Sequence, residues 1–258
     1  MPADLLYGGE HWQIARTLEQ HATASGHRAS TWVCSAGYGL VPLTAPLRPY
    51  AATFGLSHPD SAGHTTKATQ EWWTYHTTWR GPDADAPRSF TALAASAPRA
   101  ALLVVLSAAY LRACAHDLIA AATKLHRPEQ MAIISVGGGT TPELREYLLP
   151  ADAHLQAVVG GSLGALNVRL AARLLQTAAA DPFNRHDLAG RIRTLARGAR
   201  RQVPKREVLT DDKIRAFIAE RVSESSTYTS MLRQLRGAGL ACEQQRFARL
   251  FAATLGGR

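Results

Sequence analysis

The sequence predicts an α/β protein with a mainly parallel central sheet flanked by helices, joined to an all-helical, basic C-terminal region. Short apolar runs alternate with helical patterns up to residue 184, and small residues follow each apolar run directly. Beyond residue 184 only helical patterns remain, and the charge becomes strongly positive. We therefore expect an α/β domain over residues 1–184 and a helical region over residues 185–258.

The first part of the α/β domain is expected to contain one strand between two helices. Apolar residues recur at helical spacing over residues 9–24 and, with three tryptophans, over residues 67–80. Residues 31–35 form a β-prone run that meets turn-forming residues, as a buried strand ending in a loop would. Residues 41–66 are rich in Pro, Gly, Ser, Thr and His without a clear period, which predicts a long loop.

Three further strands are predicted over residues 101–106, 131–136 and 155–159, where short apolar runs occur. A helical pattern follows each of them, most clearly over residues 108–124 and 163–175. This alternation indicates parallel strands joined by right-handed crossovers.

Four helices are expected in the C-terminal region, over residues 186–200, 211–222, 227–236 and 241–255. Thr210 is a candidate N-cap for the second of these helices. Asp211 and Asp212 follow in its first turn, which suits the positive end of the helix dipole.

The net charge of +9 lies entirely in the C-terminal region. Residues 1–184 hold 13 Lys and Arg against 13 Asp and Glu, whereas residues 185–258 hold 16 against 7. A neutral body joined to a basic end is typical of an electrostatic footprint for phosphates. The alternative is a solvated helical surface that is rich in arginine.

Several classes of protein and site are not expected. No apolar run approaches the length of about 20 residues that a membrane span needs, and the first residues lack a signal pattern, so we expect a cytoplasmic protein without a membrane partner. Three widely spaced cysteines argue against a disulfide framework and a zinc site. His58 and His64, with Asp60 nearby, lack a third placed ligand, and neither glycine cluster matches a nucleotide fingerprint, so we expect no metal and no cofactor.

Candidate binding residues follow the predicted strands. Ligands of open parallel sheets bind beyond the carboxyl ends of the strands, where small residues let backbone N–H groups approach a phosphate or a base. The same glycines also make tight turns without any ligand. The candidates are Ser35, Gly37, Tyr38 and Gly39 after the first strand, Ser107 and Tyr110 after the second, Gly137, Gly138, Gly139 and Thr140 after the third, and Gly160, Gly161, Ser162 and Asn167 after the fourth.

One segment carries a resemblance to a known family. The run Cys34-Ser35-Ala36-Gly37-Tyr38-Gly39-Leu40, followed by Pro46 and Arg48-Pro49-Tyr50, resembles the signature of the YaaA-like superfamily, and Leu6-Tyr7-Gly8-Gly9 with the helix after it looks like the lead-in of that group. The match covers roughly the first 55 residues. The group includes a DNA-binding peroxide-stress protein and a relative in the pathway that installs 7-deazaguanine bases in DNA, implicated in turning the nitrile of the base into an amide.

The resemblance implies DNA or a modified base as the ligand. Ser35, Gly37, Tyr38, Gly39, Pro49 and Tyr50 carry over by position as a pocket rim. Tyr38 and Tyr50 would position the base, and Ser35 or Cys34 would be the reacting or polarising group. The alternative for Cys34 is a buried small hydrophobe.

The C-terminal region has the layout of a helix-turn-helix. Residues 227–236, the turn Gly237-Ala238-Gly239 and a helix after it would offer Gln244, Gln245, Arg246 and Arg249 to a groove of DNA. Arg200, Arg201, Lys205 and Arg206 form a basic linker that would bind phosphates. The rival interpretation is a helical cap that packs on the α/β body.

Three functions remain open at this point. The leading hypothesis is a DNA-associated enzyme of nucleobase modification, with conversion of a 7-deazaguanine base as the reaction that the resemblance implies and partner proteins of a modification or defence system. The second is a non-catalytic DNA-binding protective protein, and the third is an enzyme of free nucleotides or nucleosides. The aromatic residues of 67–80 could stack bases, although their helical spacing is typical of core.

Overall fold

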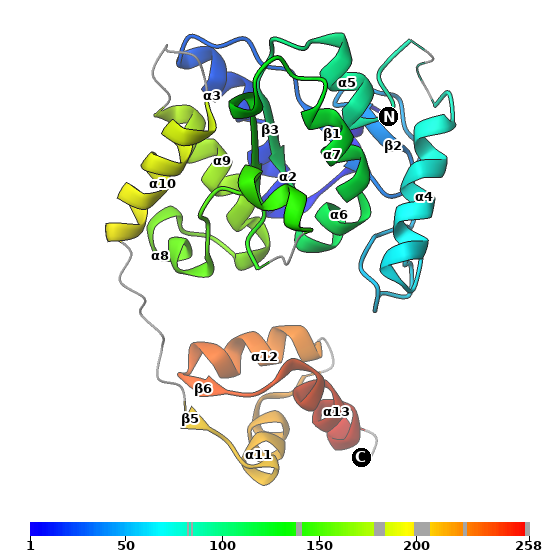
Figure 1. Cartoon of the computed structure of the whole chain (residues 1–258). Helices are drawn as coiled ribbons and strands as arrows, with labels where there is room; N and C mark the ends of the chain where they lie inside the picture. The colour runs from blue at the N-terminus through cyan, green and yellow to red at the C-terminus, as the bar shows by residue number, and fades with distance from the viewer. Residues whose placement is uncertain are drawn as a thin grey trace. The chain divides into compact units, whose positions relative to one another are not determined.

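The chain divides into two compact units, Met1–Arg200 and Arg201–Arg258. Figure 1 shows the computed structural model, which describes residues 1–81, 83, 85–137, 141–177, 184–198, 207–223 and 226–255. The division falls later than the expected position after residue 184. The reason is that α10 (Arg185–Gly198) buries Leu188, Ala189 and Ile192 in a core of the first unit.

The later division also splits the basic excess between the units. Residues 201–258 hold 11 Lys and Arg against 6 Asp and Glu, and residues 1–200 hold 18 against 14. Part of the positive charge that the sequence places in the C-terminal region therefore belongs to the first unit.

The first unit contains two small sheets. Strands β3 (Leu102–Val105) and β4 (Met131–Ile134) pair in parallel, whereas β1 (Trp32–Ser35) and β2 (Gly39–Pro42) form an antiparallel hairpin. Each of the expected strands over 31–35, 101–106 and 131–136 is present. They do not make the expected central parallel sheet in the described residues, because β1 pairs with β2 instead of with β3 or β4.

Two expectations about local structure were wrong. Residues 155–159 are not a strand: Asp152 accepts a hydrogen bond from the His154 N–H at 2.7 Å and caps a helical segment, η3 (Ala153–Leu155) followed by α8 (Gln156–Val159). The expected long loop over 41–66 begins inside a strand, since β2 continues to Pro42 and Val41 is fully buried.

Helices surround the parallel pair. Residues 9–24 form two helices rather than one, and the helix expected over 108–124 breaks at Cys114. The helical elements of the first unit other than α8, α10 and η3 are α1 (Ala3–Leu6), α2 (Gly9–Ala15), α3 (Leu18–Ala24), α4 (Thr66–Thr78), α5 (Phe90–Ser96), α6 (Ala108–Ala113), α7 (Ala115–Ala122), η1 (Pro128–Gln130), η2 (Pro142–Tyr147), η4 (Leu163–Ala165) and α9 (Leu166–Gln176).

Strand β4 separates two hydrophobic clusters. Met131 and Ile133 face a cluster that includes Leu111 and Leu118 of α6 and α7, while Ile134 faces the cluster of α9 and α10. All four residues of β4 are buried, because side chains alternate between the two faces and both faces are covered.

The second unit has its own core and is not entirely helical. It comprises α11 (Asp211–Arg221), α12 (Tyr228–Gly237) and α13 (Gln244–Leu255), with a short parallel pair of β5 (Glu207–Val208) and β6 (Leu240–Ala241). Ile214, Leu235 and Phe247 are fully buried in one cluster that draws on all three helices.

In the described residues, no single helix is long and apolar enough to cross a membrane. The segments Ala153–Val159 and Leu163–Gln176 reach that length and composition only when taken together, and they bend by 92° at their junction.

A buried arginine joins the β1–β2 hairpin to the end of α4. Arg88 is 8 % exposed, and its guanidinium donates to the carbonyl oxygens of Leu40 at 2.7 Å and Trp79 at 3.2 Å, and also to that of Tyr38. Burial lowers the pKa of Arg88. The cation is accommodated because carbonyl oxygens replace the water that it loses.

Replacement of Arg88 by methionine tests this role. The change keeps an unbranched apolar stem but removes the guanidinium and leaves the three carbonyl oxygens without their donor, so we expect the free energy of unfolding of the first unit to fall by about 2–4 kcal/mol. Urea denaturation would measure it, with the exposed Arg99→Met as the control. A loss no larger than that of the control would contradict the role.

Candidate functional site

Three hydroxyl groups meet at the carboxyl end of β1. The Tyr7 hydroxyl donates to Ser35 Oγ at 3.1 Å, the Ser35 and Tyr50 hydroxyl oxygens lie 2.6 Å apart, and those of Tyr7 and Tyr50 lie 2.8 Å apart. Ser35 is 2 % exposed, and both tyrosines are half-buried. We call Tyr7, Ser35 and Tyr50 the hydroxyl cluster.

The local fold positions each member of the hydroxyl cluster. Ser35 ends β1, and its Oγ accepts hydrogen bonds from the N–H groups of Gly37 at 3.2 Å and Tyr38 at 3.1 Å, which fixes the turn into β2. The Tyr7 ring stacks on Trp12 with centroids 4.4 Å apart. The Arg16 guanidinium donates a hydrogen bond from Nη2 to the Tyr7 carbonyl oxygen at 2.6 Å.

Close packing on a glycine places the Tyr50 ring. A Cβ atom added to Gly37 would lie 2.4 Å from Cδ2 of Tyr50. The ring therefore rests directly on the backbone of the turn, a position that a side chain at residue 37 would fill.

The hydroxyl cluster is uncharged. Burial raises the pKa of Tyr7 well above its usual range, so this phenol keeps its proton at neutral pH. Nearby, burial raises the pKa of Tyr110 to about 12. The described hydrogen bonds to the three hydroxyls come from one another and from backbone N–H groups. Such a cluster can donate and accept hydrogen bonds and deliver a proton, but it lacks the character of a strong base.

Two thiols lie close to each other near the end of β1. Cys34 precedes Ser35 in β1, and its Sγ is 3.4 Å from Sγ of Cys114, at the junction of α6 and α7. Both thiols are free. Cys114 is fully buried, which raises the pKa of its thiol and keeps it protonated, whereas Cys34 is half-buried. Of the two, Cys34 has the better access to a ligand.

Tyr38 does not join the hydroxyl cluster. Its hydroxyl exchanges hydrogen bonds of 3.1 Å with the backbone of Arg48. Its ring lies between Tyr50 and Trp79, with centroids 5.2 and 6.2 Å away. Tyr38 is thus placed to pack against a ligand rather than to exchange a proton with it.

The candidate glycines that the structure describes are not gathered into one pocket. Gly160 and Gly161 follow a helix instead of a strand, and Gly161 packs against the ion pair of Glu10 and Arg169, whose Nη2 and Oε1 atoms are 2.7 Å apart. Gly39 lies within β2, where a Cβ atom would come 2.9 Å from Cβ of His76.

Gly137 and Asn167 lie at the carboxyl ends of the parallel pair. Gly137 is exposed, and Gly138, Gly139 and Thr140 lie outside the described residues. Asn167 accepts from the Val136 N–H at 3.0 Å and donates to the Leu106 carbonyl at 2.9 Å, so its amide joins the ends of β3 and β4. Because the Asn167 amide oxygen and nitrogen are both engaged in these hydrogen bonds, they have less capacity to bond to a ligand.

The candidate nucleic-acid contacts divide into two groups. Gln244, Gln245 and Arg249 are exposed on the first turns of α13. Arg246 is tied to Asp211, with Nε 2.8 Å from Oδ1, and donates to the Leu209 carbonyl at 3.1 Å, so it connects α13 with the start of α11. The basic linker residues Arg200, Arg201, Lys205 and Arg206 lie outside the described residues.

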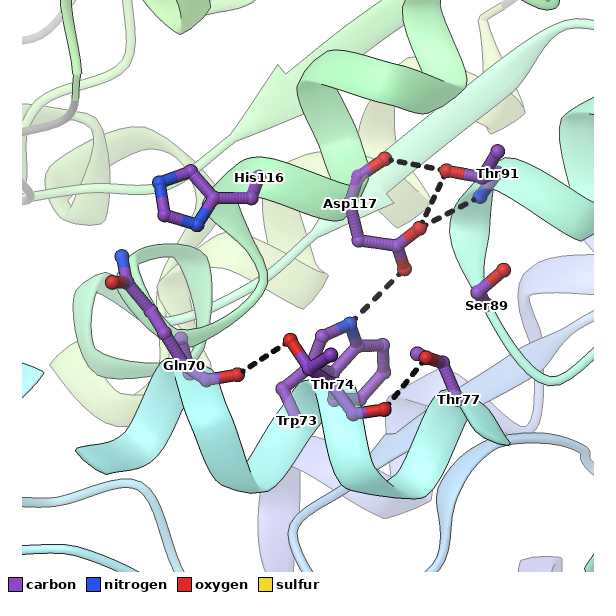
Figure 2. Close-up of a pocket in the computed structure, with 9 residues that line it drawn as sticks. Gln70, Trp73, Thr74, Thr77, Ser89, Thr91, His116 and Asp117 are labelled. Atoms are coloured by element: carbon purple, nitrogen blue, oxygen red, sulfur yellow. Dashed lines mark hydrogen bonds between the residues drawn. The ribbon is translucent and has the colours of Figure 1, made fainter. Parts of the chain in front are cut away.

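A cavity of about 290 Å³ lies elsewhere, between α4 and the α6–α7 junction, and its lining includes none of the candidate residues (Figure 2). Its carboxylate, Asp117, is already occupied: it accepts from the Trp73 indole at 3.0 Å, from the Phe90 N–H at 2.8 Å and from the Thr91 hydroxyl at 2.6 Å. Because Asp117 anchors the start of α5, we place the candidate site at the hydroxyl cluster and not here.

Sequence reasoning missed Tyr7 as a site residue, and it missed Arg88 altogether. The signal for Tyr7 was the segment Leu6-Tyr7-Gly8-Gly9, which the resemblance included without assigning a role. No group of three or more His, Cys, Asp or Glu side chains in the described part of the chain could hold a metal ion.

Replacement of Gly37 by alanine tests the packing of the site. The new methyl group would displace the Tyr50 ring, so we expect the free energy of unfolding to fall by about 1–3 kcal/mol and the near-ultraviolet circular dichroism of the tyrosines to change. Gly8→Ala is a matched control, since nothing lies within 4 Å of a Cβ atom there and neither glycine has a positive φ. Equal effects of the two changes would contradict the packing.

In comparisons with known proteins, no family model, no curated protein and no solved structure matches this chain. The YaaA-like resemblance stays a prediction.

Proposed function

We propose that the first unit binds a nucleobase at the hydroxyl cluster and that the protein is an enzyme of nucleobase modification acting on DNA. The observation that carries the proposal is the meeting of three uncharged hydroxyls among aromatic rings, with a half-buried thiol on the neighbouring residue of β1. The edge of a base offers donors and acceptors without formal charge, and hydroxyls can pair with both.

The hydrogen bonds favour Cys34 over Ser35 as the reacting group. Ser35 Oγ already has four partners, from Tyr7, Tyr50 and two backbone N–H groups, so an attack by this oxygen would dismantle the turn. Cys34 carries a free thiol and is half-buried. A thiol is also the stronger nucleophile of the two.

The reaction that the resemblance implies, hydration of a nitrile on a 7-deazaguanine base, fits this assignment. The Cys34 thiol would add to the nitrile carbon while the nitrile nitrogen takes a proton from Tyr7, which regains one from the thiol. Water then displaces the thiol and leaves the amide. Tyr7 suits the role because it keeps its proton at neutral pH.

Replacement of Tyr7 by phenylalanine tests the catalytic proposal. Loss of the proton donor should slow base conversion by about 10²-fold or more, and Cys34→Ala should abolish it. Mass spectrometry of nucleosides from DNA treated with the protein measures conversion. Tyr38→Phe is the matched control, because the described hydrogen bonds of its hydroxyl go to the backbone of Arg48 and the hydroxyl should matter little. Unchanged conversion by both Tyr7→Phe and Cys34→Ala would refute the proposal.

A second candidate, non-catalytic binding of DNA, is favoured by the surface of α13. Gln244 and Gln245 are exposed in its first turn, where Glu243 accepts from the N–H groups of Gln245 at 2.9 Å and Arg246 at 2.8 Å, and Arg249 is exposed one turn later. Glutamine and arginine are the side chains that pair with adenine and guanine edges in the major groove.

The triple change Gln244→Ala, Gln245→Ala and Arg249→Ala tests this candidate. We expect the affinity for duplex DNA to fall at least about tenfold at fixed salt, because these side chains supply base and phosphate contacts. Gel-shift titration measures it, and Arg99→Ala in the first unit is the control. An affinity equal to that of the control would rule out this face of α13. Binding without any change in the bases would favour this candidate over the enzyme.

A further inference from the structure

Helix α4 and the residue that caps its carboxyl end, Trp79, expose three aromatic rings. Tyr75 is 61 % exposed, Trp79 is 41 % exposed and Trp72 is 37 % exposed, whereas Trp73 is buried in the core. The helical spacing of these residues predicted core, and only Trp73 follows that expectation. We call Trp72, Tyr75 and Trp79 the aromatic face of α4. Large aromatic rings gathered on a surface mark an interaction site.

The aromatic face of α4 is ordered by contacts among the rings. Trp72 stacks with Tyr75 at a centroid distance of 5.8 Å, and the buried His76 meets the edges of Trp72 at 4.9 Å and Trp79 at 6.2 Å. Rings held in this way lose little freedom when they bind a ligand.

The same rings continue to the hydroxyl cluster. The Trp72 indole donates to the Ala36 carbonyl at 2.7 Å, and Ala36 directly follows Ser35. Tyr38 lies 6.2 Å from Trp79 and 5.2 Å from Tyr50 between ring centroids. A row of aromatic contacts therefore runs from Tyr50 to the surface of α4.

Cations accompany the aromatic face of α4. The Arg88 guanidinium lies 5.4 Å from the centre of the Trp79 ring, and Arg80 and Arg48 are exposed and make no ion pair in the described residues. Arg48 is bound through its backbone to the Tyr38 hydroxyl, and Arg80 follows Trp79 in the chain. The nearby acid Glu71 is neutralised by Lys67 at 3.8 Å.

We infer that the aromatic face of α4 stacks the unpaired bases that flank the target base in a single strand. Exposed aromatic rings with adjacent cations fit a chain of planar bases joined by phosphates, while an apolar protein segment would gain nothing from the arginines. The inference rests on the proposed function for the class of ligand. It names the substrate as a single-stranded or locally opened nucleic acid.

Replacement of Tyr75 by alanine is the sharpest test. Tyr75 is the most exposed ring and its side chain makes no described hydrogen bond, so the variant should fold normally. The affinity for a single-stranded DNA oligonucleotide, measured by fluorescence anisotropy, should fall roughly 5- to 150-fold. Tyr75→Phe should keep it, since the ring remains. Trp79→Ala should act in the same direction, and Tyr228→Ala, an exposed tyrosine of the second unit, should have no effect.

Several outcomes would overturn the inference. The first is that Tyr75→Ala leaves the affinity for the single strand unchanged, and the second is that the intact protein does not bind the strand at all. The third is that Tyr75→Ala changes self-association, measured by sedimentation, and not the binding of DNA. Its failure is separable from that of the proposed function. Loss of affinity in Tyr75→Ala together with unchanged base conversion in Tyr7→Phe and Cys34→Ala would keep the stacking surface and reject the reaction.

Discussion

The turn between β1 and β2 depends on two sets of backbone hydrogen bonds that point in opposite directions. Ser35 Oγ accepts from the N–H groups of Gly37 and Tyr38, and the Arg88 guanidinium donates to the carbonyl oxygens of Tyr38 and Leu40. One hydroxyl and one cation therefore fix a short peptide from both sides. The Tyr50 ring packs on Gly37 of this turn, and the Trp72 indole of α4 donates a hydrogen bond to the carbonyl oxygen of Ala36 in the same turn.

This arrangement explains why the candidate site is polar yet uncharged. The buried Arg88 is bound to carbonyl oxygens and the carboxylate of Asp117 is bound at the start of α5, and the described contacts of the three hydroxyls involve no ion. Burial withdraws the water that would stabilise a charged phenolate, so it raises the pKa of Tyr7 and keeps this hydroxyl protonated. The ring of Tyr38 contacts Tyr50 of the hydroxyl cluster and also Trp79 at the end of α4.

The sequence predicted most elements but not how they pair. Hydrophobic periodicity and composition located β1, β3 and β4, but the pairing of strands depends on contacts between distant segments. The chain reverses at Gly37, so that β1 pairs with β2 in an antiparallel hairpin. Residues 155–159 were misassigned because a short apolar run fits a strand and a helix equally well. Ser35 was found as a candidate from its position after the first predicted strand and Tyr50 through the resemblance. Arg88, in contrast, carries no local pattern that distinguishes a buried guanidinium from an exposed one. The partner of Arg246, 35 residues away, was equally invisible.

The hydroxyl cluster forms a closed circuit in which each oxygen gives its single hydrogen to the next. With Tyr7 donating to Ser35, the two remaining contacts require Ser35 to donate to Tyr50 and Tyr50 to donate to Tyr7. None of the three hydroxyl hydrogens is then free to bond to a ligand. A ligand that binds here would therefore have to replace one of these hydrogen bonds with its own. This requirement disfavours ligands with a single polar atom and favours ligands that offer an adjacent donor and acceptor.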